Sequence, residues 1–232
     1  MKRVVFLAAM AVSTLVAASA EAGQWYVRAD AGYGVSADTE LKERDCAGTC
    51  GAPVKGDLGD GGSIGVGVGY QVKPWLRTDV TATYRGGYRF DGNAVGGGNY
   101  QQDFDAVTGM VNGYVDIRGL TKTKMGAFHP YVGAGIGVSH NQSGHAEFTN
   151  ASGPGEGPDG SRTDFAWSLT AGSGIMVIKD KLMFDVAYHY TDLGRAGVDS
   201  GSFVQGGVST PVNGGEANIQ LHEITAGLRY MF

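Results

Sequence analysis

Hydrophobic and polar residues alternate with a period of two along much of the chain, which is typical of β-strands whose two faces meet different surroundings. In the first such run, Trp25, Val27 and Tyr33 share one face, whereas Arg28 and Asp30 lie on the other. Seven further runs repeat the pattern, at residues 63–71, 76–85, 107–117, 131–139, 165–177, 182–191 and 223–232. The alternation therefore predicts eight strands.

A β-sandwich in water would also alternate, but three features of these runs favour a membrane barrel. The runs match the roughly 9–11 residues that a tilted strand needs to cross a bilayer. Aromatic residues stand at their ends, and long polar connections alternate with short turns, as in outer-membrane barrels. We predict an all-β fold, an eight-stranded antiparallel transmembrane β-barrel with short periplasmic turns and four long extracellular loops at residues 35–61, 86–104, 140–163 and 193–217.

Composition narrows the class of protein further. Glycine contributes 40 of the 232 residues, against a usual share of roughly 7%. Charged residues make up only 18%, and the formal net charge is -5, which excludes a strongly basic nucleic-acid binder. Two cysteines are too few for a disulfide scaffold.

The first residues have the organisation of a secretory signal peptide. Lys2 and Arg3 precede an apolar stretch at residues 4–16, and the triplet at 18–20 (ASA) fits the small-x-small cleavage rule. We expect residues 1–20 to form the signal peptide, with cleavage after Ala22 as the alternative. Residues 23–232 then form a barrel domain in the outer membrane of a Gram-negative bacterium.

Ionisable residues on the polar faces are expected to point into the barrel. Eight strands leave an interior just wide enough for side chains to fill it, so charges there must be paired. The residues concerned are Arg28, Asp30, Arg77, Asp79, Arg85, Asp116, Asp185, Glu223 and Arg229. We predict that they form a lumen network that packs and orients the barrel, with a conducting path along these charges as the alternative.

The remaining candidate residues do not form a catalytic site. Cys46 and Cys50 lie in the first long connection, where an oxidising compartment favours a small disulfide. A metal site would need two further ligands that the C-x3-C spacing does not supply. His222 and Glu223 have no serine at the neighbouring outward position, so we expect no enzymatic activity, no cofactor and no metal site.

The end of the chain carries a candidate assembly signal. Phe232 is terminal and Tyr230 precedes it at the alternate position of the last strand. This arrangement resembles the C-terminal signal that the outer-membrane assembly machinery of Gram-negative bacteria reads.

Several segments together resemble a known family. They are residues 111–116 (VNGYVD), 130–137 (PYVGAGIG), 165–174 (FAWSLTAGSG), 187–194 (AYHYTDLG) and 229–232 (RYMF). The chain is similar to the small eight-stranded outer-membrane proteins of the OmpA-like transmembrane and opacity type, especially the alphaproteobacterial surface-antigen branch. The resemblance implies a structural or surface-exposed barrel whose variable loops carry adhesion, antigen or envelope roles, without a catalytic site.

We therefore expect a structural and surface-interaction role, adhesin-like or antigen-like, carried by the outer loops. A narrow pore for small solutes across the outer membrane is the alternative. The expected partners are outer-membrane lipid and lipopolysaccharide, the assembly machinery, and host or surface ligands of the loops. We expect a monomer and no nucleic-acid partner.

Overall fold

A computed structural model describes residues 23–37, 39–43, 54–94, 98–121, 126–150 and 153–232. The expected signal peptide and the expected disulfide between Cys46 and Cys50 lie outside these residues. Within the described part, no helix is long and apolar enough to cross a membrane.

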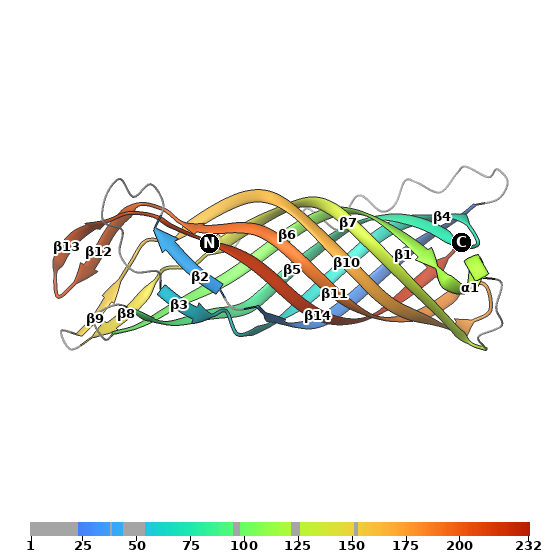
Figure 1. Ribbon diagram of the computed structural model, residues 1–232, viewed down its shortest axis with the longest axis horizontal. Helices are drawn as coiled ribbons and strands as arrows, with labels where there is room; N and C mark the ends of the chain where they lie inside the picture. The colour runs from blue at the N-terminus through green and yellow to red at the C-terminus, as the bar shows by residue number, and fades with distance from the viewer. Residues whose placement is uncertain (1–22, 38, 44–53, 95–97, 122–125, 151–152) are drawn as a thin grey trace.

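Eight long strands form one closed antiparallel ring, which confirms the predicted fold class (Figure 1). In chain order they are β1 (Gln24–Ser36), β4 (Asp60–Lys73), β5 (Leu76–Ala94), β6 (Gly98–Asp116), β7 (Phe128–Ser143), β10 (Gly160–Ile178), β11 (Leu182–Val198) and β14 (Gly215–Met231). Each pairs with the next, and β1 pairs with β14 from Tyr26↔Met231 to Ser36↔Leu221. This closure leaves no free edge in the ring of eight strands.

The two faces of the ring separate as the alternation predicts. Outward positions such as Ile64, Val80 and Ile136 are apolar and exposed, whereas inward positions such as Arg77 and Asp185 are buried. An apolar outer belt suits lipid, and the closed ladder supplies the backbone hydrogen bonds that the bilayer cannot.

Short connections lie at one end of the ring, which also holds the helix α1 (Ile117–Thr121) (Figure 1). The first and last strands meet there, where the Phe232 N–H donates to the Trp25 carbonyl at 3.0 Å. Short turns of outer-membrane barrels face the periplasm, so this end is the periplasmic one.

At the opposite end, the described parts of the four long connections are largely β structure rather than irregular loops. They contain β2 (Thr39–Glu43), β3 (Val54–Asp57), β8 (Glu147–Asn150), β9 (Gly153–Glu156), β12 (Gly201–Gln205) and β13 (Val208–Val212). Neighbouring hairpins are joined edge to edge through the pairs β3–β5, β6–β8, β9–β12 and β14–β2. We call these six strands, with the outer parts of β5, β6, β11 and β14, the crown.

The polarity of the strands inverts where they enter the crown. On β5, Arg85 faces inward below a bulge and Tyr88 and Phe90 face inward above it, while Arg89 is exposed. Gly87 lies in this bulge with φ 85°, a left-handed conformation that an L side chain rarely adopts. Because the bulge adds one residue, the alternation shifts by one position.

A second bulge acts in the same way on β11, between Asp192 and Arg195, where Gly194 has φ 70°. At this level the inward positions of β5, β6, β11 and β14, together with Leu58, build an apolar core inside the crown. Its members are Leu58, Tyr88, Phe90, Phe104, Ala106, Leu193, Ala196, Ala217, Ile219 and Leu221. Above the bilayer the outer surface meets water, so burying apolar side chains inside is favourable there.

Replacing Gly87 by Ala should destabilise the folded barrel by about 1–2 kcal/mol, because the left-handed φ penalises a Cβ although nothing lies within 4 Å of it. Gly109→Ala is the matched control, since its Cβ position is equally open and no positive φ is required. Urea unfolding of the refolded proteins in lipid vesicles measures both. Equal stabilities of the two variants would contradict a conformational role for Gly87.

Candidate functional site

The barrel interior contains a network of paired charges at the level of the membrane. Arg28 donates to both oxygens of Asp30 at 2.7 and 2.9 Å, and also reaches Asp79 at 3.4 Å. Asp79 further accepts from the Tyr26 hydroxyl at 3.1 Å and from the Asn112 amide at 2.8 Å. The buried carboxylate thus collects several donors, which offsets its loss of hydration.

Two further arginines close the periplasmic half of the lumen. Arg77 lies between two aromatic rings, 4.4 Å from the centroid of Tyr114 and 4.1 Å from that of Tyr131. Arg229 forms a two-pronged pair with Asp185, with both N–O distances 3.0 Å. Stacking against aromatic faces and paired hydrogen bonds both suit the planar guanidinium group, and a lysine would not reproduce them.

One ion pair stands directly below the crown. The Arg85 Nε lies 3.0 and 2.9 Å from the two carboxylate oxygens of Glu223, and Arg85 also donates to Thr108 at 2.9 Å. All three residues are buried. The pair spans the lumen between β5 and β14 and marks the boundary between its polar part and the apolar core above.

The space that remains between these layers is small. A polar cavity of about 50 Å³ is lined by Arg28, Arg85, His189 and Glu223, among others. That volume holds a few water molecules and is far below that of an open channel. Both ring nitrogens of His189 are satisfied by the Thr170 and Thr225 hydroxyls, at 3.0 and 3.1 Å.

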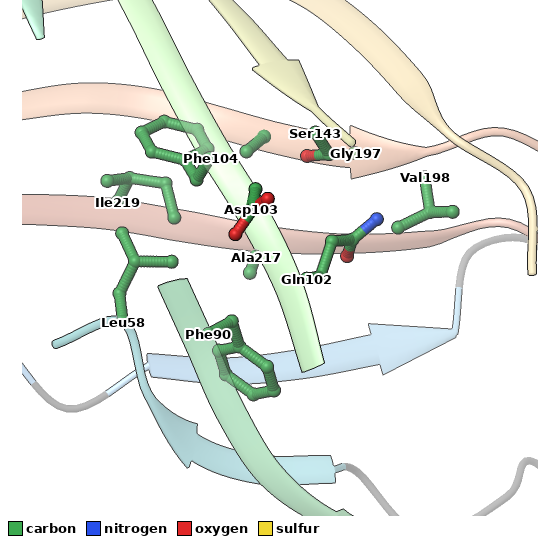
Figure 2. A pocket seen from close by; sticks show the side chains of 11 residues that line it. Leu58, Phe90, Gln102, Asp103, Phe104, Ser143, Gly197, Val198, Ala217 and Ile219 are labelled. Carbon is green, nitrogen blue, oxygen red and sulfur yellow. The ribbon is translucent and has the colours of Figure 1, made fainter. Parts of the chain in front are cut away.

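A second cavity lies in the apolar core of the crown. Leu58, Phe90, Phe104 and Ile219 converge on it from separate segments, as Figure 2 shows. Its volume is about 30 Å³, whereas an apolar cavity needs roughly 150 Å³ to hold a benzene ring. The cavity is therefore too small to be a site for an organic ligand of that size.

The structure brings eight of the nine proposed lumen residues into this interior. The ninth, Asp116, also follows the inward register, opposite Tyr131, but it lies at the end of β6, where it accepts a hydrogen bond from the Gly119 N–H at 2.9 Å. A carboxylate at that position caps the following helix, which is the physical reason for its place at the periplasmic rim. Tyr230 and Phe232 point outward, with ring centroids 5.3 Å apart.

Sequence reasoning did not assign a role to the residues that surround the charges. Tyr26, Tyr114, Tyr131 and Asn112 occupy the same inward alternation as the arginines, so the signal was present. In the apolar core of the crown, the bulges at Gly87 and Gly194 shift the alternation on β5 and β11. The core residues of β6 and β14 keep the inward phase, so there only the change from polar to apolar residues hid their role. Among the described residues, no group of three histidine, cysteine, aspartate or glutamate side chains is placed to hold a metal ion.

Comparison with known proteins identifies a family with this architecture. A family model described as "Outer membrane protein beta-barrel domain" matches residues 4–232. The chain is 28% identical to a putative adhesin of Rickettsia canadensis over 250 residues, covering 99% of each protein. It is also 28% identical to the outer membrane protein PagN of Salmonella typhimurium over 160 residues, which cover 64% of this chain and 63% of PagN.

Among solved structures, the outer membrane protein OprG of Pseudomonas aeruginosa superposes with a TM-score of 0.62 at 15% identity, over 91% of this chain and 96% of OprG. The outer membrane protease OmpT of Escherichia coli gives a TM-score of 0.53 at 13% identity, over 89% of this chain and 97% of OmpT. At these identities the likeness is one of fold alone.

Replacing Arg85 by Met should destabilise the barrel by about 3–5 kcal/mol, because the Glu223 carboxylate then remains buried without its partner. The double variant Arg85→Met with Glu223→Gln should recover part of this loss. Urea unfolding followed by tryptophan fluorescence measures the cycle.

Arg89→Met is the matched control for this cycle. Arg89 pairs with Asp103 at 2.8 Å, but both side chains are more than half exposed, at 57% and 64%. Water screens such a pair, so its loss should leave stability nearly unchanged. If Arg85→Met and Arg89→Met were equally stable, the lumen pair would not hold the barrel together.

Proposed function

Because the chain belongs to the outer membrane protein beta-barrel domain family, we propose that this Gram-negative outer-membrane protein acts in surface contact through its crown, in the manner of an adhesin. The observation that carries the proposal is the edge-to-edge joining of all four outer hairpins above an apolar core. A surface fixed in this way loses little conformational entropy when it binds a partner.

The similarity to a relative described as an adhesin supports this proposal. The match to the putative adhesin of Rickettsia canadensis covers nearly the whole of both chains. The outer connections at residues 35–61, 86–104, 140–163 and 193–217 carry 13 acidic and 6 basic residues. That balance favours a neutral or basic partner over a polyanionic one.

The alternative of a narrow pore is less well supported. The lumen is filled by the ion pairs of Arg28, Arg85 and Arg229, and the apolar core of the crown covers it on the outer side. A conducting path would have to break buried pairs and pass an apolar layer, and both steps are costly.

The barrel itself has a separate set of proposed partners. We assign its outer belt to membrane lipid and lipopolysaccharide, and the terminal Tyr230 and Phe232 to the assembly machinery. No catalytic role is part of the proposal.

Surface display tests the function. Bacteria that display the wild-type barrel should adhere to cultured epithelial cells at least tenfold more than bacteria displaying a variant with residues 145–157 and 200–214 replaced by short turns. The ring strands stay intact in that variant, so it should still show the heat-dependent shift in gel mobility of a folded barrel.

The same purified barrel should produce no discrete conductance steps in a planar bilayer. Equal adhesion by the shortened variant, at equal surface density, would contradict a crown-based function. Steady conductance steps would instead support the pore.

A further inference from the structure

The β12–β13 hairpin differs from the rest of the crown in its surface chemistry. Residues 200–215 contain no charged side chain, although the outer connections as a whole are rich in carboxylates. Among the crown side chains whose exposure the structure describes, Val204 and Val208 are the large apolar ones left exposed, at 46% and 66%. Figure 1 shows this hairpin at the far end of the molecule, beyond the barrel.

The hairpin is held in a fixed position. A two-residue turn, Gly206-Gly207 with φ 57° and 80°, joins the strands, and five residue pairs connect β12 to β13. Both positive φ values are those of the tight turn that suits the twist of a hairpin. On the other side β12 pairs with β9, and the Gln205 amide donates to the Gly153 carbonyl at 2.7 Å.

The two valines lie on opposite faces of the hairpin. Val204 is opposite Ser209 and Val208 is opposite Gln205 in the pairing, and residues that are directly opposite share a face. Each face of the tip therefore carries one exposed valine opposite a polar residue, Ser209 or Gln205, and we call this two-faced tip the wedge. A wedge buries both side chains only when it enters a groove.

Carboxylates border this wedge on one face. The register across β8, β9 and β12 places Glu147 opposite Glu156 and Glu156 opposite Val204. Both glutamates are exposed. Two like charges directly opposite each other destabilise a sheet. Arg89 pairs with Asp103 and also acts on Glu147, so this patch keeps an excess of negative charge that a cationic group of a partner would balance.

Addition of a strand to the hairpin is a less suitable mode of binding. In the pairing of this two-residue hairpin, Ser209 and Pro211 direct their backbone groups to the open edge of β13. Proline has no N–H to donate there, which protects the edge from pairing with another strand. Contact through the side chains of the tip is therefore the mode of binding that remains.

From these observations we propose that the Val204–Val208 tip and the Glu147–Glu156 pair form the docking surface for a protein partner, which inserts the tip into an apolar groove bordered by lysine or arginine side chains. An apolar centre with a charged rim is the usual anatomy of a protein interface. A lipid surface fits less well, because residues 200–215 lack the tryptophan, tyrosine and basic residues that anchor chains at a bilayer.

The inference rests on the proposed surface-contact function, and point variants on displayed barrels test it. The Val204→Ser, Val208→Ser double variant should reduce adhesion to epithelial cells at least tenfold, because each buried valine contributes to the contact. Glu147→Gln with Glu156→Gln should reduce adhesion severalfold and weaken its dependence on salt.

Asp105→Asn is the matched control, since it also removes a carboxylate but from the ring part of β6, outside the outer connections. It should leave adhesion within twofold of the wild type. All variants should keep the heat-dependent mobility shift and equal surface density.

Two further experiments distinguish a protein partner from a lipid surface. Trypsin treatment of the epithelial cells should abolish adhesion of the wild type, and phosphatidylcholine vesicles should not bind the displayed barrel. Unchanged adhesion by the valine variant would overturn the inference while leaving the proposed function in place. Vesicle binding that depends on the valines would overturn the protein partner, and a wild type that does not adhere would overturn both the inference and the function.

Discussion

The structure depends on one constraint. At each level along the barrel, the apolar face of the wall must lie against an apolar environment, either lipid outside or a core inside. At the level of the membrane the outside is lipid, so apolar residues face out and the charges pair within the lumen. Beyond the membrane the outside is water, and the apolar residues turn inward. On β5 and β11 a glycine bulge at the boundary shifts the alternation, whereas on β6 and β14 the inward positions keep their phase and change from polar to apolar residues.

This inversion of polarity links the membrane-spanning ring of strands to the crown. The Arg85–Glu223 pair forms the upper layer of the polar lumen, and Tyr88 begins the apolar core directly above it. That core lies among β5, β6, β11 and β14 and includes Leu58, and edge pairing such as β9–β12 joins the outer hairpins to one another. The tip at Val204 is therefore positioned, through a continuous β structure, by strands that are fixed in the bilayer.

The sequence predicts the membrane part of this fold well, because period-two alternation is simple and repeated there. Trp25, Ile64, Val80 and Leu228 point outward as their positions in the pattern require. The sequence did not predict the crown, for two physical reasons. The bulge at Gly87 breaks the alternation, and the strand pairs between hairpins involve only two or three residues from distant segments, such as Gly56↔Gly92. Asp116 follows the inward pattern but ends its strand, so local helix capping determines its place.

Amide hydrogen exchange in lipid vesicles tests the central claim most directly. If the crown is a continuation of the barrel around an apolar core, the amides of residues 88–90, 104–106 and 217–221 should be protected to a degree similar to those of residues 77–85. Exchange of the first three segments at the rate of unstructured chain, with residues 77–85 still protected, would contradict the account. The outer connections would then be loops on a barrel that ends at the membrane surface.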